Sequence, residues 1–325
     1  MNGKASVAAI ILVALVFSGL AAYVQFYANP ARAFVKNYST TYTVHGVVEI
    51  YVNGELVLTA HNDITSDGLK HARNLLADGG GGASDAVNDL KVRYEDVNSG
   101  QIKYLTKDDA SVSDIQMDYD GDGSSDPGWQ VEWEWNITGS WDIEYAHLMW
   151  GGASGGTDFA TYDIDPDIPL ENGDKFKLIW KIYVCGSKDM DTGTGDDFVA
   201  YAGAVHLRDM LKTGNGEAVT DILIYKASYA TYAKAENLSP SKDDSNPNSP
   251  KYTVSHTFTI NDDLTASNDR IRGSWLDWDG SVTASSSATD FFADYDFRDD
   301  GSDGDLPLLP GDTLTITWTI TITRS

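Results

Sequence analysis

Residues 313–323 read TLTITWTITIT, and they alternate strictly between apolar side chains and threonine. Every second position is apolar: Leu314, Ile316, Trp318, Ile320 and Ile322. A period of two residues is typical of a β-strand with one buried face and one face in water. The segment therefore predicts a long strand that covers a hydrophobic core.

A related segment occurs earlier in the chain. Residues 168–182 read IPLENGDKFKLIWKI, and they match LPLLPGDTLTITWTI at 306–320 without a gap. A second pair consists of GLKHARNLLADG at 68–79 and GAVHLRDMLKTG at 203–214, which share glycine, histidine, arginine and leucine positions. Both members of the second pair read as short helices that end at a glycine. Two blocks in the same order predict an internal duplication.

The duplication sets the predicted fold class. We expect a mainly β chain with two tandem β-sandwich or jelly-roll-like domains, each with one short helix, after an N-terminal apolar helix. The predicted divisions are residues 1–33, 34–184 and 185–325. The stretch CGSKDMDTGTGDD at 185–197 is rich in turn-forming residues and suits a domain boundary.

The N-terminal segment predicts export from the cytoplasm. After Lys4 the chain carries no charge from Ala5 to Asn29, which is long enough to span a bilayer as a helix. One interpretation is a secretory signal cleaved after the small-x-small triplet 31–33, which would leave Phe34 as the new terminus. Another is an uncleaved membrane anchor. Both place the rest of the chain outside the cell or on its surface.

A third interpretation rests on a family resemblance. Lys4-Ala5-Ser6 followed by VAAIILVALVFSGLAAYVQFY resembles the start of archaeal type IV pilins, over about the first 30 residues. The resemblance implies that a leader is removed just before the apolar helix, and that this helix forms the core of a filament. Ile10 stands where many pilins carry an acidic residue.

The composition indicates a folded, strongly acidic protein. Hydrophobic residues make up 42% and aromatic residues 11%, while 49 acidic and 23 basic residues give a net charge of −26. Such a surface repels phosphate backbones, so nucleic acid is not an expected partner. Forty of the acids are aspartate, which favours turns and supplies ligands for hard cations.

Two acidic loops predict calcium (Ca²⁺) sites. In DYDGDGSSD at 118–126 the ligand candidates are Asp118, Asp120, Asp122 and Asp126, with the spacing of an EF-hand-type loop. Trp129 stands where such a loop would carry its closing glutamate. A weaker candidate is RDDGSDGD at 298–305, with Asp299, Asp300, Asp303 and Asp305. The alternative for both loops is a solvated acidic turn.

No catalytic motif is present, and we expect no enzymatic activity. The chain lacks HExxH, GxSxG and a P-loop, and its single cysteine, Cys185, rules out an intramolecular disulfide. The repeated His71 and His206 each stand two residues before an arginine, which favours packing or a hydrogen bond over catalysis. Sequons at Asn37, Asn136 and Asn237 agree with surface exposure.

These features favour a self-assembling structural subunit of an extracellular filament, pilus or surface fibre, whose partner is a copy of itself. In the stretch FVKNYSTTYTVH at 34–45, one face carries Phe34, Tyr38, Tyr42 and Val44, as a strand donated to a neighbouring sheet would need. This pattern resembles fibres linked by donated strands. The alternatives are a membrane-anchored adhesin or carbohydrate-binding protein, for which nine tryptophans would supply stacking surfaces, and a secreted hydrolase.

Overall fold

The computed structural model describes residues 31–119, 121, 123, 125–186, 198–199, 201–279, 291–297 and 304–324. The predicted apolar helix and most of the predicted domain boundary lie outside these residues. Asp120, Asp122, Asp299, Asp300 and Asp303 of the predicted calcium loops also lie outside them.

The prediction of a mainly β chain is confirmed. The described residues contain two α-helices, α2 (Ser66–Asp78) and α3 (Tyr201–Thr213), and a short 3-10 helix, η1 (Ala83–Asp85). All other regular elements are strands, which form one sheet of eight strands and two sheets of five.

Sheet A has eight strands in the order β14-β15-β18-β1-β10-β7-β6, with β2 also paired to β1. Its strands are β1 (Ala33–Val52), β2 (Glu55–His61), β6 (Ser111–Met117), β7 (Asp126–Asn136), β10 (Lys175–Gly186), β14 (Ser241–Asp243), β15 (Lys251–Thr259) and β18 (Thr313–Arg324).

The two smaller sheets each have five strands. Sheet B has the order β3-β9-β8-β4-β5, with β3 (Asp63–Ile64), β4 (Val87–Asp96), β5 (Gln101–Lys107), β8 (Trp141–Trp150) and β9 (Thr157–Leu170). Sheet C has the order β11-β17-β16-β12-β13, with β11 (Phe198–Val199), β12 (Asp221–Lys226), β13 (Thr231–Ala235), β16 (Ile271–Asp277) and β17 (Ala293–Asp296).

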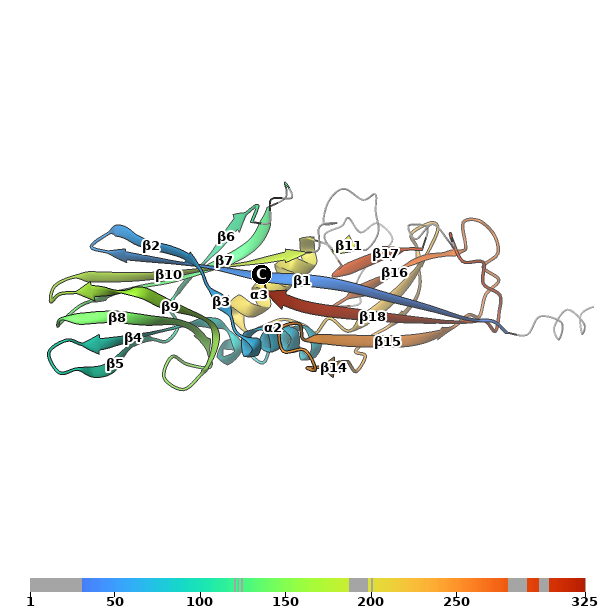
Figure 1. Ribbon diagram of the computed structural model, residues 1–325. Coiled ribbons are helices and arrows are strands. Elements are labelled where there is room, and N and C mark those ends of the chain that lie inside the picture. The colour runs from blue at the N-terminus through green and yellow to red at the C-terminus, as the bar shows by residue number, and fades with distance from the viewer. Residues whose placement is uncertain are drawn as a thin grey trace, which may run out of the picture.

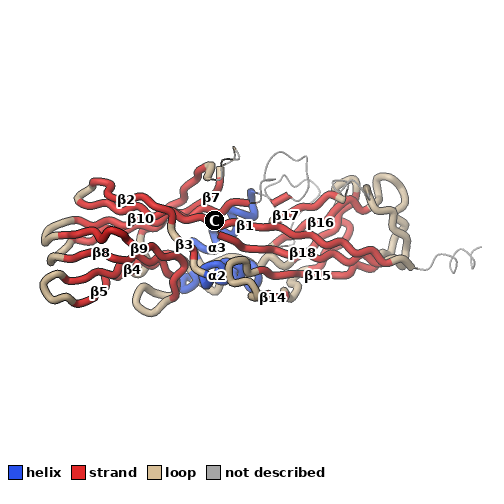
Figure 2. The backbone as a smooth tube through the Cα atoms, viewed as in Figure 1, coloured by secondary structure: helices blue, strands red, loops and turns tan. Residues whose placement is uncertain are grey.

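The molecule is elongated, with sheet B and sheet C toward opposite ends and β1 running through both parts (Figure 1). We call sheet B with β6, β7 and β10 the sheet-B half, and sheet C with β14, β15 and β18 the sheet-C half. The helices lie at the middle of the long axis, between the two groups of strands (Figure 2). One large cluster of buried side chains includes residues of both halves.

The strand at 313–323 has the predicted faces. Leu314, Ile316, Ile320 and Ile322 are fully buried, and Trp318 is 1% exposed. The intervening threonines are only partly buried, because they point away from the core. β18 lies between β15 and β1, so both of its edges are hydrogen-bonded over most of its length.

Both helices end at a glycine, as the sequence predicts. The N–H of Gly79 donates to Leu75 and the N–H of Gly214 donates to Met210, and both glycines have positive φ. A left-handed residue directly after the last turn is the usual way to end a helix, and glycine adopts it without steric cost.

Candidate functional site

Residues 33–44, the first part of β1, lie parallel to β18. The pairing runs from Ala33 beside Thr313 to Val44 beside Arg324 without a register shift. The second part of β1 pairs antiparallel with β10, from Tyr42 beside Gly186 to Val52 beside Phe176. We call residues 33–44 the N-terminal segment. This segment completes sheet A over the sheet-C half, while the rest of the same strand belongs to the sheet-B half.

One face of the N-terminal segment is part of the core. Tyr42 and Val44 are fully buried, Tyr38 is 6% exposed, and Phe34 packs against the core while partly exposed. The prediction that these four side chains share one face is confirmed. Their burial contributes on the order of 1.5–3 kcal/mol for each fully buried side chain.

Aromatic contacts hold Tyr38 between residues of the sheet-C half. Its ring centroid lies 4.0 Å from that of Tyr295 in a stacked arrangement, and 5.1 Å from that of Trp318. Phe297 stacks at 6.1 Å. Such pairs add to the stabilisation that burial alone provides.

Tyr42 lies closely against the N-terminal turn of α3. Its hydroxyl donates a hydrogen bond to the carbonyl of Phe292, over 3.3 Å. A Cβ added at Gly203 would lie 2.3 Å from the hydroxyl oxygen of Tyr42, so only glycine fits there. The glycine that the two helical sequence blocks share thus allows close approach of the segment in the second block.

A salt bridge holds the start of the segment. The guanidinium of Arg32 donates to Asp312, with Nη2 at 2.6 Å and Nε at 3.1 Å from Oδ2, and the Arg32 N–H donates to Oδ1. Burial alone would raise the pKa of Asp312, but the hydrogen bonds from Arg32 outweigh burial and lower this pKa. Asp312 is therefore a carboxylate at neutral pH and fixes the register of β1 on β18.

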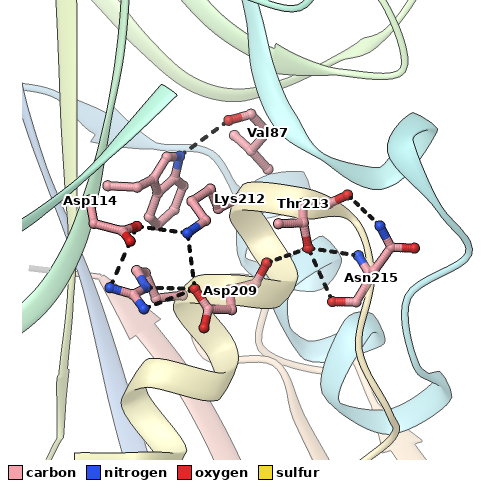
Figure 3. A network of polar contacts seen from close by, with 8 residues as sticks. Val87, Asp114, Asp209, Lys212, Thr213 and Asn215 are labelled. Carbon is pink, nitrogen blue, oxygen red and sulfur yellow. Dashed lines mark hydrogen bonds and ion pairs between the residues drawn. The ribbon is translucent and has the colours of Figure 1, made fainter. Parts of the chain in front are cut away.

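Polar side chains of the two helices connect the halves. From α2, Arg73 pairs with Asp244, which follows β14, at 2.8 Å. From α3, Lys212 donates to Asp114 of β6 at 2.7 Å and also pairs with Asp209 (Figure 3). The hydrogen bond that Lys212 donates lowers the pKa of Asp114, although burial opposes this. Helix α3, which contains the second of the two matching helical sequence blocks, packs against β7 and β10 of the sheet-B half.

The two histidines of the repeated blocks have equivalent packing roles, as the sequence predicts. His71 stacks on Trp150 with ring centroids 4.3 Å apart, and its Nε2 lies 2.8 Å from the carbonyl of Asp85. His206 stacks on Trp278 at 4.4 Å, with Nε2 3.0 Å from the carbonyl of Glu217. Burial lowers the pKa of both histidines, so both are neutral at pH 7.

Three of the predicted calcium ligands lie in the described residues. The carboxylate of Asp118 accepts hydrogen bonds from the N–H groups of Gly121 and Gly123, and Asp126 accepts one from the N–H of Tyr119. These bonds curl the loop around Asp118, and the oxygens retain lone pairs for a cation. Asp305 is partly buried, and burial raises its pKa. Within the described part of the chain, no three acidic, histidine or cysteine side chains are arranged to hold a metal.

Two groups of polar residues were not anticipated from the sequence. The hydroxyl of Tyr119 lies 2.6 Å from Nδ1 of His61, which ties the acidic loop to β2. Asp277 is fully buried, and burial raises its pKa to about 7, with further increases from Asp279 and Asp221. Alternation predicts which strand positions are buried, but it does not show that two strands bring Asp221 and Asp277 side by side.

A shallow pocket of about 290 Å³ lies beside Trp133. It is lined by Ser111, Glu132, Trp133, Glu134 and Lys177. The Trp133 side chain is 39% exposed, and the ammonium of Lys107 lies 4.4 Å from the centre of its ring. An exposed tryptophan beside polar side chains is the arrangement that the sugar-binding alternative requires.

No family model matches the chain, and a search of curated proteins finds no significant match. Within the residues that the structure describes, neither helix is long and apolar enough to cross a bilayer.

Proposed function

We propose that this chain is a non-enzymatic structural subunit of an extracellular filament, in which copies are linked by exchange of the N-terminal segment. The observation that carries the proposal is the place of residues 33–44. They fill the edge of β18 in the sheet-C half, although they continue directly into the sheet-B half.

The physical basis is that the edge of β18 offers the same contacts to the N-terminal segment of its own chain and to that of another copy. Tyr38 and Tyr42 would bury the same area against Tyr295, Trp318 and Phe292 in either case. Exchange of an identical element between copies therefore has a low cost. If each copy gives its segment to the next and receives one from the previous copy, the contact does not close, and a linear fibre results.

The proposal includes an internal duplication of the β-domain. Equivalent contacts recur in the two halves: Trp129 donates to the carbonyl of Val87, and Tyr252 donates to the carbonyl of Val219. The stacked His71–Trp150 and His206–Trp278 pairs recur in the same way. We propose that the halves descend from one β-domain. Residues 33–44 then lie parallel along β18. Residues 42–52 of the same strand lie antiparallel along β10, in the equivalent position of the other half.

A disulfide that locks the segment onto its own chain tests the proposal. Thr43 and Thr323 are register partners with hydroxyl oxygens 3.1 Å apart, so cysteines at both positions meet the spacing of a disulfide. Cys185 is the partner of Thr43 on the other edge, so the test uses a Cys185→Ala background. We expect the oxidised T43C/T323C monomer to form no fibres by electron microscopy, and the reduced protein to form them.

The matched control is T257C/T315C in the same background. Its hydroxyl oxygens lie 2.8 Å apart and join β15 to β18 within one half, so this disulfide leaves the segment free. The control should assemble in both redox states. Normal fibres from the oxidised T43C/T323C monomer would rule out exchange of the segment.

The fate of the predicted apolar helix at the N-terminus separates two modes of assembly. In a pilin-like subunit the retained helix would form the filament core. Cleavage after Ala33 would instead free the segment but remove Arg32, which pairs with Asp312. Mass spectrometry of the mature N-terminus distinguishes these modes, and a terminus upstream of Arg32 would preserve the salt bridge.

Calcium is proposed as a stabiliser of the acidic loop at 118–126. Asp118 accepts hydrogen bonds from the backbone N–H groups of Gly121 and Gly123. These bonds hold its carboxylate within the turn of the loop, where a cation would bind. Calcium should raise the melting temperature of the wild-type chain but not that of the D118N/D120N/D122N variant. An identical wild-type melting curve in calcium and in chelator would contradict this site.

The exposed Trp133 supports a second candidate, a carbohydrate-binding surface protein. Sugar rings would stack on the indole, and Glu132, Glu134 and Lys177 would bond their hydroxyls. Glycan arrays with the wild-type chain and a Trp133→Ala variant test this candidate. Binding that Trp133→Ala abolishes would favour it over a purely structural role.

A further inference from the structure

The outer face of β15, β18 and the N-terminal segment carries almost only hydroxyl-bearing or small uncharged side chains. These three strands run side by side in Figure 1. The face consists of Thr253, Ser255, Thr257 and Thr259 from β15, the six threonines from Thr313 to Thr323 from β18, and Val35, Asn37, Ser39, Thr41 and Thr43 from β1. We call it the hydroxyl face.

The hydroxyl face is ordered in rows across the strands. Thr257, Thr315 and Val35 form one row, and Ser255, Thr317 and Asn37 form the next. Hydroxyl groups of neighbouring strands bond one another in four of these rows, at 2.8–3.2 Å: Thr257 with Thr315, Ser255 with Thr317, Thr253 with Thr319, and Thr43 with Thr323. Because these hydroxyls already have a partner, covering them loses fewer bonds to water.

The absence of charge contrasts with the rest of the molecule. The chain carries a net charge of −26, but among the described residues of these three strands only Lys251, at the margin, brings a charge to this face, where it pairs with Asp243 of β14. The outer face of sheet A in the sheet-B half carries charged pairs instead, including Lys181 with Glu49 and Lys177 with Glu132. Copies of so acidic a chain repel one another at most approaches, but not where two uncharged faces meet.

The dimensions of the face suit a contact between two copies. β18 has 12 residues. At ~3.3 Å per residue and ~4.8 Å between strands, three strands present roughly 500 Å². Two such faces bury about 1,000 Å² in total, which is about the minimum expected of a biological interface. Val35, 61% exposed, adds apolar area at one end.

We propose that the hydroxyl face is a docking surface for the hydroxyl face of a second copy of this chain. The two sheets would pack face to face across a two-fold axis, with their threonine rows in contact. In the proposed fibre this contact is lateral and joins neighbouring fibres. The inference does not require exchange of the N-terminal segment, because a segment from either copy presents the same side chains outward.

Charge substitutions at the centre of the face test the proposal. Thr317→Asp and Thr317→Lys each place like charges opposite one another in a two-fold contact. For the full-length chain we expect each variant to weaken self-association at least tenfold in sedimentation equilibrium. An equimolar mixture of the two variants should regain it, because the opposed charges are then unlike. Thr59→Asp, on an exposed position of β2, is the matched control and should associate like wild type.

The outcomes separate this inference from the proposed function. If the wild type forms bundled fibres and Thr317→Asp forms only single fibres, both proposals are supported. Wild-type dimers without fibres would support the hydroxyl face alone. Unchanged association of both Thr317 variants, with melting curves like wild type, or failure of the mixture to regain association, would overturn the proposed docking surface.

Discussion

Arg32 and Asp312 show how one residue pair fixes the start of a long strand. Asp312 is almost fully buried on its side-chain atoms while Arg32 is about half exposed. Asp312 also accepts the N–H of Leu309, so its two oxygens organise the turn before β18 as well as the segment. Removing the charge therefore affects both strands of the parallel pair.

We predict that Asp312→Asn lowers the free energy of unfolding by about 1–2 kcal/mol at neutral pH, as expected for loss of charge-assisted hydrogen bonds. The folded-state pKa of Asp312 is lowered, so its contribution is present above the unfolded pKa and is lost as pH falls through the folded value. Urea titrations of both chains across acidic pH check this. The two curves should converge at low pH, whereas an exposed Asp262→Asn control should follow wild type throughout.

At the scale of elements, the sequence predicts faces and ends better than partners. The alternation at 313–323, the shared face of Phe34, Tyr38 and Tyr42, and the glycines after both helices follow from local chemistry, and the structure has each of them. The pairing of residues 33–44 with residues 313–324 does not follow, because it joins segments about 280 residues apart. The register depends on side chains such as Tyr295 that no local pattern connects to Tyr38.

The same limit applies to the candidate site. The spacing predicts Asp118 and Asp126 as calcium ligands, which stays a prediction, but it gives no sign of the contact between Tyr119 and His61 or of the buried Asp277. Each of these depends on two strands meeting, and the side chains that meet are distant in sequence. The division into two tandem domains stays a prediction, and sheet A contains strands of both halves.

The glycine that ends α3 and a glycine in the turn between β1 and β2 give a matched test at this scale. Gly214 has φ +69°, and an added Cβ would lie 2.0 Å from the carbonyl oxygen of Gly82. Gly54 has φ +84° with no atom within 4 Å of such a Cβ. We expect Gly54→Ala to cost about 1 kcal/mol from backbone strain alone, and Gly214→Ala at least about 3 kcal/mol. Equal losses in urea unfolding would mean that the close approach of the two loops is not retained in solution.

At the scale of the whole molecule, the N-terminal segment determines whether the sheet-C half is complete. A chain that begins at His45 would leave one edge of β18 and the ring of Trp318 without their partners on β1. We predict that this chain has a lowered melting temperature and binds a hydrophobic dye. A synthetic peptide of residues 31–44 should restore the melting temperature of the wild type.

A peptide of the same length with Tyr38 and Tyr42 replaced by serine is the control, and it should restore little, because burial of these two rings drives the association. Full stability of the shortened chain without any peptide would show that the groove closes on its own and would weaken the case for exchange.

β1 is a single strand of 20 residues, about 66 Å long at ~3.3 Å per residue, and it is hydrogen-bonded to β18 along its first part and to β10 along its second. Where the two ladders overlap, at Tyr42 to Val44, the strand has partners on both edges. To bend the molecule at its middle, this doubly paired stretch would have to break. We expect a chain built in this way to behave as a stiff rod, and in the proposed filament such subunits would resist bending.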